Sequence, residues 1–385
     1  MIDRTLRAKI QSVKEKFPIL TLTGPRQSGK TTLLKTIYHD YPYVSLEDLD
    51  NRQLAKQDPR AFLANYPNGA VIDEIQNVPE LFSYLQTVVD SKEIHFALSG
   101  SQNFLLLEKI TQTLAGRTII LKLLPLSISE IQQKHHISHW EDLAFQGFYP
   151  RIYHKNIAPV DFYPSYINTY VERDVRSLKN IGDLVTFTNF LKLCAGRIGQ
   201  ILNVQSLATD AGISPNTAKS WLSILETGYI VHFVQPHHNN LGKRIIKSPK
   251  LYFYDTGLAC SLLGIENADQ LRSHYLKGGL FENMVVNEFL KSRFNEGKAS
   301  NIYFWQSKDR KEIDLVTDNQ EIYEIKTSQT RQPHLFDNLL YWQKLNPSST
   351  NTPTVIYGGD ENQITSQGLF LSWRNLGDSF IGHNR

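Results

Sequence analysis

The segment Gly24–Thr31 constrains this chain of 385 residues more than any other feature of the sequence. It reads GPRQSGKT and so fits the pattern Gly-x-x-x-x-Gly-Lys-Ser/Thr in full. The apolar run Ile19–Thr23 before it predicts a buried strand, and a helix is expected from about Lys30. A glycine-rich turn between a strand and a helix N-terminus presents backbone N–H groups to a phosphate. The segment therefore predicts a phosphate-binding loop, with a plain strand–helix turn as the alternative.

The residues of this loop have expected roles toward a nucleoside triphosphate. Lys30 would reach the β- and γ-phosphates, and the Thr31 hydroxyl would ligate Mg²⁺. The residues expected to hold ATP are Gly24, Pro25, Arg26, Gln27, Ser28, Gly29, Lys30, Thr31 and Thr32.

An acidic partner for the metal ion follows the buried strand expected at Ala70–Asp73. Asp73 would hold Mg²⁺ through water, and Glu74 would polarise the attacking water as the general base. The alternative is a carboxylate pair that only begins the next turn. ATP and Mg²⁺ are therefore the expected cofactors, and ATP hydrolysis is the expected reaction.

Two further polar positions are candidates for the same reaction. Ser99, at the end of the next strand, would touch the γ-phosphate or order the water; Ser101 is the other choice, and ordinary turn chemistry explains both. Arg117 precedes the strand expected at Ile119–Leu124. An arginine supplied by a neighbouring subunit can stabilise a transferring phosphoryl group, whereas a surface arginine at a helix C-terminus is the alternative.

Apolar strand-like runs alternate with helical patterns through the first third of the chain. This alternation predicts an α/β fold in which helices cover both faces of a parallel sheet. The expected strands are Ile19–Thr23, Tyr43–Leu46, Ala70–Asp73, His95–Leu98 and Ile119–Leu124.

The order of these elements and motifs resembles the core of AAA+ ATPases. Further stretches resemble one bacterial and archaeal AAA+ family that carries a C-terminal domain of unknown function. The resemblance implies ATP binding and an AAA+ fold, and an arginine acting between subunits implies a homo-oligomer. The stretches are GPRQSGKTTL (24–33), VIDEIQNVPELF (71–82), SGSQNFLL (99–106), LAGRTIILKLLPLSISEI (114–131), YVERDVRSL (170–178), KLYFYDTGLACSLLG (250–264), GGLFENMVVNE (278–288) and FWQSKDRKEIDLV with EIYEIKTS (304–328).

The middle of the chain has helix-turn-helix patterning. A short helix at 204–211 is followed by a tight turn, and Ser214 with Pro215 begins a second helix. That helix places Asn216 and Lys219 away from its apolar face, and a basic hairpin follows with Lys243, Arg244, Lys247 and Lys250. A basic wing beside a recognition helix would grip DNA phosphates. The alternative is a winged helix used only for protein packing.

The C-terminal part carries acidic residues on strand-like runs at 301–305, 312–317 and 321–327. Asp314 is followed ten residues later by Glu324, and Lys326 shares a strand face with Glu324. Together with Glu282 on a preceding helix, this order resembles the PD-(D/E)xK nuclease superfamily. The resemblance implies that Asp314, Glu324 and Glu282 bind a divalent metal and that Lys326 activates water. The alternatives are a surface Glu–Lys pair on an edge strand and a nuclease fold without activity.

Composition and charge leave this domain organisation open to several functions. The net charge of +3 neither requires nor excludes a nucleic-acid partner. The presence of only two cysteines suits a reducing compartment. No run of apolar residues approaches the length of a membrane span. With Asp3, Arg4 and Lys9 at its start, the chain predicts no secretory signal, so a cytoplasmic protein without a membrane partner is expected. The expected segments are an ATPase core (1–125), a helical lid or connector (126–200), a winged-helix-like module (201–270) and a restriction-endonuclease-like α/β domain (271–385).

Three functions fit this organisation. The first is an oligomeric, ATP-driven machine that binds or remodels DNA, with or without nuclease activity. The main alternative is a nucleotide-controlled switch in signalling or defence, with a protein partner and an inactive nuclease-like domain. The third is a structural ATPase whose nuclease-like domain only mediates assembly.

Overall fold

The computed structural model describes residues 2–101, 113–171, 184–237, 248–307, 309–347 and 349–377, and they form two compact units. Unit 1 comprises residues 1–126 with 227–229 and 293–299, and unit 2 comprises the remainder. Unit 1 thus contains the whole segment 1–125 that was expected for the ATPase core. The three segments expected at 126–200, 201–270 and 271–385 fall within one unit, apart from the short pieces assigned to unit 1.

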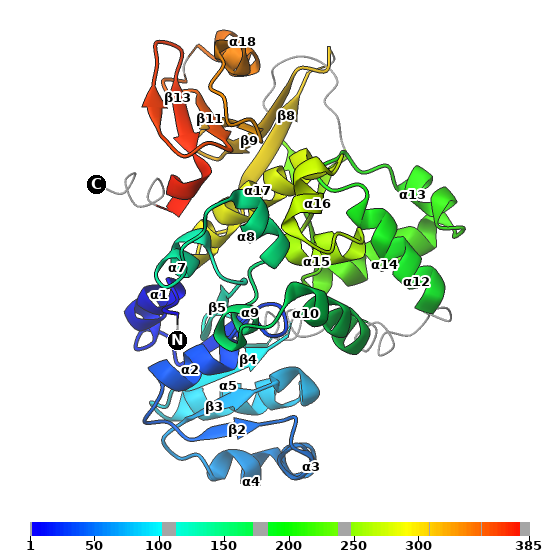
Figure 1. The fold of residues 1–385 in the computed structure, drawn as a ribbon. Coiled ribbons are helices and arrows are strands. Elements are labelled where there is room, and N and C mark those ends of the chain that lie inside the picture. The colour runs from blue at the N-terminus through cyan, green and yellow to red at the C-terminus, as the bar shows by residue number, and fades with distance from the viewer. Residues whose placement is uncertain are drawn as a thin grey trace. The chain divides into compact units, whose positions relative to one another are not determined.

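Unit 1 is built on a five-stranded parallel sheet, which confirms the predicted α/β core (Figure 1). The strand order is β2-β3-β4-β1-β5, so β4 lies between β1 and β3. Because all strands are parallel, the carboxyl ends of β1, β3 and β4 meet at one edge of the sheet. The strands are β1 (Ile19–Thr23), β2 (Tyr43–Ser45), β3 (Ala70–Asp73), β4 (Phe96–Gly100) and β5 (Thr118–Lys122).

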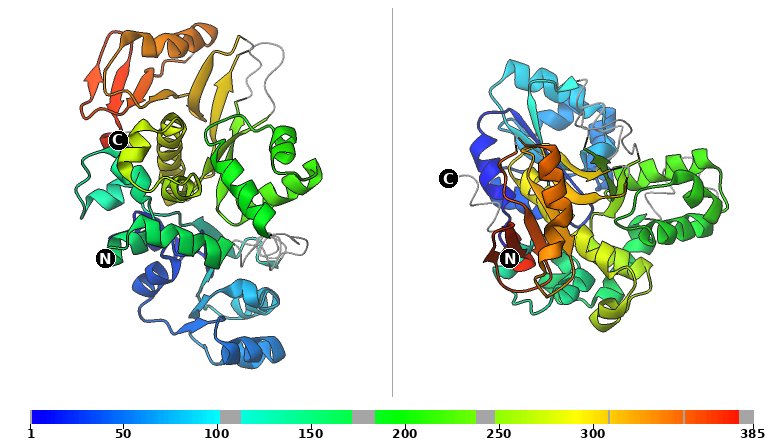
Figure 2. Two further views of the ribbon diagram at one scale, coloured as in Figure 1. Left: turned by 45° about the vertical axis from the view of Figure 1, so that its right-hand side comes forward. Right: turned by 90° about the horizontal axis from the view of Figure 1, so that it is seen from above.

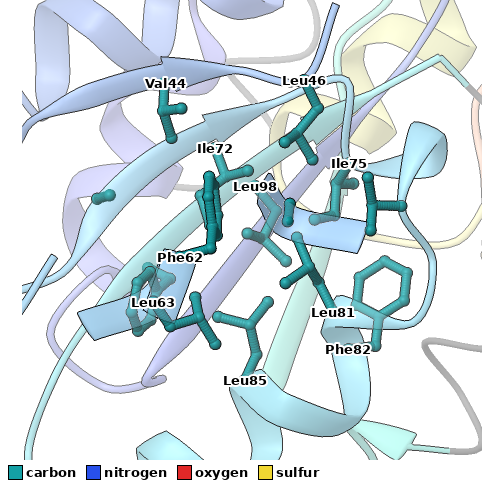
Figure 3. Close-up of a cluster of buried hydrophobic side chains, with 14 of the residues drawn as sticks. Val44, Leu46, Phe62, Leu63, Ile72, Ile75, Leu81, Phe82, Leu85 and Leu98 are labelled. Carbon is teal, nitrogen blue, oxygen red and sulfur yellow. The ribbon is translucent and has the colours of Figure 1, made fainter. Parts of the chain in front are cut away.

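Helices cover both faces of this sheet because its strands are apolar on both sides. On one face Leu20 and Leu22 of β1 pack with α1 and α2, and on the other Ile72 and Leu98 pack with α4 and α5 (Figure 3). The helices are α1 (Leu6–Val13), α2 (Lys30–Ile37), α3 (Leu49–Gln57), α4 (Pro59–Ala64) and α5 (Leu81–Ser91), with a 3-10 turn η1 (Ile75–Asn77).

Unit 2 contains an eight-stranded mixed sheet in the order β12-β13-β11-β10-β9-β8-β6-β7. Ile322 of β10 packs in a cluster with Leu339 and Trp342 of α18, whereas the adjacent Tyr323 meets Phe289 of α17 with ring centroids 4.7 Å apart. Successive strand residues point to opposite faces, so α18 and α17 cover opposite sides of the sheet (Figures 1 and 2). The strands are β6 (Val231–Pro236), β7 (Lys250–Phe253), β8 (Ile302–Gln306), β9 (Glu312–Thr317), β10 (Ile322–Lys326), β11 (Thr354–Tyr357), β12 (Gln363–Ile364) and β13 (Leu369–Ser372).

The remaining elements of unit 2 are mainly short helices. They are α7 (Ile128–Gln132), α8 (Trp140–Gln146), α9 (Pro150–Lys155), α10 (Pro159–Tyr166), η2 (Ile167–Val171), α12 (Leu184–Ala195), α13 (Val204–Asp210), α14 (Pro215–Thr227), α15 (Thr256–Leu262), α16 (Ala268–Ser273), α17 (Lys277–Asn295), η3 (Pro333–Phe336), α18 (Asp337–Leu345) and η4 (Trp373–Asn375). No helix in the described part of the chain is long and apolar enough to cross a lipid bilayer.

The predicted helix-turn-helix is present as α13 and α14. Ser214 caps α14, since its Oγ accepts a hydrogen bond of 3.1 Å from the Thr217 N–H. Leu222 and Leu225 of α14 are buried, whereas Asn216 and Lys219 are exposed as expected.

The hairpin that follows is not a free wing. Its strand β6 pairs in parallel with β8 as well as antiparallel with β7, so the hairpin continues the C-terminal sheet. The expectation that Lys250 lies on a basic wing is wrong, because Lys250 is only 2% exposed. Lys243, Arg244 and Lys247 lie outside the described residues.

Candidate functional site

The predicted phosphate loop connects β1 to α2 in a conformation that requires its glycines. Gly24 has φ of 148°, and a Cβ there would lie 2.2 Å from the Leu123 carbonyl oxygen. Gly29, at the start of α2, has φ of 94°, a left-handed value that side chains disfavour. Gln27 also has positive φ, 60°. The motif residues therefore form the tight turn that the sequence predicted.

Lys30 points into this turn and is buried. Its Nζ donates hydrogen bonds to the carbonyl oxygens of Gly24 (2.9 Å) and Pro25 (2.8 Å). Burial lowers the pKa of Lys30 to about 8, although the nearby carboxylates of Glu74 and Asp73 oppose this shift. The half-buried Arg26 adds a small lowering effect on the same pKa. The ammonium group of Lys30 is thus held at the centre of the loop, where the sequence pattern predicts that it contacts phosphate.

Asp73, at the end of β3, accepts hydrogen bonds from four surrounding groups. Its Oδ2 accepts from Thr31 Oγ1 (2.9 Å) and from the Tyr43 hydroxyl (2.8 Å). Its Oδ1 accepts from Ser99 Oγ and from the Glu74 N–H (3.1 Å). Strand order explains this convergence, because β3 lies between β2, which carries Tyr43, and β4, which carries Ser99. Ser99 and Tyr43 therefore orient the Asp73 carboxylate.

Glu74 is held in an unusual backbone conformation beside Asp73. Its φ of 55° and ψ of 44° are left-handed, which is uncommon for a residue other than glycine. Gln76 Nε2 donates to Glu74 Oε2 and also to Ser101 Oγ (3.1 Å), so Gln76 links the expected base to the end of β4. Burial raises the pKa of Glu74 above its usual value, and the Gln76 hydrogen bond opposes this.

The residues of the loop fit a magnesium–nucleotide. Ser28 Oγ and Gln27 Oε1 are buried and have no hydrogen-bond partner among the described residues. Ser28 Oγ could donate to a phosphate oxygen, and Lys30 supplies a positive charge. The hydroxyl of Thr31 lies beside the Asp73 carboxylate, and such oxygen ligands suit Mg²⁺. Thr32 is exposed on the first turn of α2.

Sequence reasoning missed Tyr43 and Gln76. Tyr43 lies on β2, and no local sequence pattern predicts that β2 pairs with β3. Gln76 had a local signal, since it lies two residues after the expected base.

Arg117 lies at the opposite edge of the sheet from the loop. It precedes β5, which runs parallel to β1, and its carbonyl oxygen accepts from the Ile19 N–H (3.1 Å) at the start of β1. The five residues of β1 separate these two edges by about 16 Å. The Arg117 guanidinium pairs with Asp90 of α5 through Nε–Oδ1 (2.6 Å) and Nη2–Oδ2 (2.8 Å). The Arg117 side chain therefore cannot reach a phosphate bound at the loop of its own chain.

A second group of charged residues lies in unit 2 around β9 and β10. The antiparallel register of Ile322 with Val316 places Glu324 opposite Asp314. Lys326 Nζ lies 2.7 Å from Glu324 Oε1 and 3.3 Å from Asp314 Oδ2. The alternative of a surface pair on an edge strand is wrong, because β10 lies between β9 and β11 and Glu324 is buried.

Glu282 of α17 joins this group through a lysine that sequence reasoning had placed elsewhere. Lys250 Nζ lies 2.8 Å from Glu282 Oε1, and it also pairs with Glu312. The Tyr252 hydroxyl, two residues along β7, donates to the same Glu282 oxygen (2.6 Å). Lys250, Tyr252 and Glu312 are thus site residues that the sequence analysis missed. The spacing of two within β7 and within β9 was the available signal.

Carboxylates outnumber lysines in this group, and the excess of negative charge raises the pKa values of Glu324 and Lys250. Burial and the Asp314 charge raise the pKa of Glu324 to about 8, against the opposing effect of Lys326. Burial alone would lower the pKa of Lys250, but Tyr252 and the neighbouring carboxylates raise it well above its usual value. The raised pKa of Lys250 keeps its side chain charged. The raised pKa of Glu324 means that this carboxyl is protonated near neutral pH, which reduces the excess of negative charge in the group.

Three segments of the chain match known families. Residues 16–132 match a family described as "AAA domain". Residues 137–269 and 277–376 match two families described as "Domain of unknown function", DUF8612 and DUF4143. The first match contains the phosphate loop, Asp73, Glu74 and Arg117.

Relatives of this chain are found in bacteria. The chain is 28% identical over 322 residues to "Uncharacterized protein Mb2031c" of Mycobacterium bovis, covering 82% of this chain and 71% of that one. It is 21% identical over 361 residues to an uncharacterized protein of Haemophilus influenzae, covering 84% and 86%. A Walker-type ATPase of Pyrococcus abyssi covers 68% of this chain and 96% of its own, with 14% identity and a TM-score of 0.45. The segment of residues 16–132, which carries the phosphate loop on a parallel sheet, thus matches the AAA domain family, and two segments that match families of unknown function follow it.

Proposed function

We propose that this protein hydrolyses ATP with Mg²⁺ at the loop between β1 and α2. The observation that carries the proposal is the contact between Thr31 Oγ1 and Asp73 Oδ2 (2.9 Å), together with the buried Lys30 and the half-buried Glu74. A metal-binding hydroxyl, a carboxylate, a phosphate-binding ammonium and a second carboxylate are the groups that phosphoryl transfer to water requires.

Each of these residues has one role in the proposed reaction. Lys30 exchanges its two carbonyl partners for phosphate oxygens, which restores opposite charge around the buried ammonium. Thr31 and Asp73 hold Mg²⁺, which when bound neutralises charge on the phosphates. Glu74 accepts a proton from the attacking water, and Gln76 positions its carboxylate. Ser99 and Tyr43 keep Asp73 in place.

We further propose that the complete site forms between two copies of the chain. Arg117 lies about 16 Å along the strands from its own loop, which favours a role at the site of a neighbouring subunit. Its bidentate pair with Asp90 holds the guanidinium until a neighbour offers the more highly charged triphosphate. The assembly is then a homo-oligomer in which each copy supplies an arginine.

The role of Lys30 predicts a pH dependence of ATP binding. With a pKa of about 8 in the free protein, Lys30 is mostly protonated at pH 7 and mostly neutral at pH 9. Because phosphate binds the protonated form, we expect the ATP affinity to fall about ten-fold from pH 7 to pH 9. The measurement is a titration with a fluorescent ATP analogue and Mg²⁺ at each pH.

The Lys30→Ala variant tests whether this ammonium is responsible. We expect its affinity at pH 7 to be at least about 30-fold weaker, with the fall toward pH 9 abolished. Lys56→Ala, which removes an exposed lysine of α3, is the matched control and should behave as the wild type. Tight binding of ATP by folded Lys30→Ala protein would exclude this loop as the nucleotide site.

A second function, DNA binding, is favoured by the exposed polar face of α14. This helix follows a short turn after α13, is capped by Ser214, and presents Asn216 and Lys219 to solvent while Leu222 is buried. A helix with this placement can enter a groove or lie along phosphates. We propose that α14 contacts DNA and that Lys243, Arg244 and Lys247 add phosphate contacts.

The DNA proposal predicts a loss of affinity when the charge on α14 is reversed. We expect Lys219→Glu to weaken duplex binding equally across sequences and to reduce the salt slope by about one, as loss of a phosphate contact does. Lys192→Glu makes the same change at an exposed position of α12 and is the control. Binding is followed by fluorescence anisotropy at several salt concentrations. Equal affinities in both variants, with an ATPase rate unaffected by DNA, would favour the nucleotide-controlled switch with a protein partner.

A further inference from the structure

A lysine ammonium occupies the centre of the acidic cluster of unit 2, which consists of Glu282, Glu312, Asp314 and Glu324. Lys250 Nζ lies 2.8 Å from Glu282 Oε1, pairs with Glu312, and lies 3.9 Å from Asp314 Oδ1. Its side chain is only 3% exposed. Carboxylates from α17 and from β9 therefore converge on one nitrogen that has no access to bulk water.

Several oxygens of the cluster have partners other than Lys250. Asp314 Oδ2 accepts from the Ile325 N–H (2.8 Å) and lies 3.3 Å from Lys326 Nζ. Glu282 Oε1 accepts from the Tyr252 hydroxyl (2.6 Å), and Glu312 Oε2 accepts from Gln306 Nε2 (2.7 Å). Glu324 Oε2 is buried and has no hydrogen-bond partner among the described residues. Two ammonium groups thus satisfy a cluster whose order of residues resembles a metal-dependent nuclease.

This arrangement does not fit a divalent metal. A metal ion of the kind that such nucleases use needs several oxygens of one site at about 2.0–2.6 Å. Lys250 already stands between Glu282, Glu312 and Asp314, and its Nζ lies at a charge-assisted hydrogen-bond distance from Glu282 Oε1 (2.8 Å). A second cation at the same oxygens would face a buried positive charge at close range. Among the described residues, no group of three or more His, Cys, Asp or Glu side chains is arranged to hold a metal.

We propose that Lys250 takes the place of the metal ion in this cluster, so that the wild-type site binds no divalent cation and carries out no metal-dependent cleavage. Its carboxylates serve to hold Lys250 and Lys326, and through them they join β7, β9, β10 and α17. Removing the amine of Lys250 then leaves an uncompensated acidic pocket that accepts a metal ion. The proposal concerns unit 2 alone and is independent of ATP hydrolysis in unit 1.

The test is a titration of the full-length, nucleotide-free chain with Mn²⁺, in which electron paramagnetic resonance measures free Mn²⁺. The proteins are the wild type, Lys250→Met, Lys250→Met with Asp314→Asn, and Asp314→Asn alone. We expect Lys250→Met to gain one site with an affinity at least about ten-fold above that of the wild type, and Asp314→Asn to abolish that gain. The phosphate loop is unchanged in all four proteins, so any weak Mn²⁺ binding there is the same in each of them and does not affect the comparison.

Lys291→Met is the matched control. Lys291 is another buried lysine of unit 2, with its Nζ 2.7 Å from Glu288 Oε1, so its loss also leaves a buried glutamate without its partner. We expect no new Mn²⁺ site in this variant. A new site in Lys291→Met of equal strength would show that any lost lysine creates binding, and it would overturn the proposal.

Two other outcomes would also overturn it. One is Mn²⁺ binding by the wild type that Asp314→Asn removes, because the native cluster would then be a metal site. The other is a folded Lys250→Met protein, checked by circular dichroism, that gains no site. If Lys250→Met does not fold, the wild type and Asp314→Asn decide the question alone: equal binding supports the proposal, and a loss contradicts it.

Discussion

The Glu74→Gln variant will bind ATP as the wild type does and will lose nearly all turnover. A glutamine side chain has the shape of glutamate and can still accept from Gln76, so the loop and Asp73 keep their geometry. It cannot take a proton from water, and loss of a general base costs about 10²- to 10⁴-fold in rate. The measurement is steady-state phosphate release with Mg²⁺, beside an ATP titration of the same protein.

The control for Glu74→Gln is Glu80→Gln, the same change at an exposed position six residues along the chain. We expect Glu80→Gln to hydrolyse ATP at the wild-type rate. A normal rate in Glu74→Gln would remove Glu74 as the base. Loss of ATP binding together with turnover would instead indicate that Glu74 supports the loop rather than the reaction.

Arg117→Ala is expected to lower the ATPase rate about 10³- to 10⁵-fold while ATP affinity is kept. The reason is that the guanidinium stabilises charge on the transferring phosphoryl group at a neighbour's site, and its own loop does not contact it. Mixing Arg117→Ala with Lys30→Ala protein should restore part of the rate, since one chain supplies the loop and the other the arginine. The measurement is phosphate release across a series of mixing ratios.

Asp90→Asn separates this role from a structural one. It breaks the same ion pair with Arg117 but leaves the guanidinium available. The pair is exposed, so solvent screening keeps its contribution to stability small. We expect Asp90→Asn to remain active. An equal loss of rate in both variants, or no recovery on mixing when both chains assemble, would refute transfer of the arginine between subunits.

The phosphate loop could be predicted from the sequence because its determinants are local. The glycines, Lys30 and Thr31 lie within eight consecutive residues, and only glycine tolerates the backbone at Gly24 and Gly29. Asp73 and Glu74 were found in the same way, at the end of a short apolar strand. Helix capping by Ser214 and the polar face of α14 are also local, since a helix repeats every 3.6 residues whatever surrounds it.

The partners of these residues depended on strand order, which no short segment encodes. Asp73 meets Ser99 because β4 is inserted beside β3, and it meets Tyr43 because β2 flanks the other side. The sequence indicated that Ser99 touches the γ-phosphate or orders the attacking water, whereas in the fold its hydroxyl donates a hydrogen bond to the Asp73 carboxylate. Strand order follows from how helices cover both faces of the sheet, which is a property of the whole unit.

Lys250 shows the difference most clearly. In the sequence it follows Lys243, Arg244 and Lys247 and so belongs to a basic hairpin that suits a DNA-binding wing. In the structure β6 joins β8, and this pairing brings β7 close enough for Lys250 to reach Glu282 and Glu312. The sequence by itself determined which residues carry charge and which segments form strands and helices. Only the tertiary structure decided which charges meet, because burial in one sheet brings together residues more than 60 positions apart and makes their pairing obligatory.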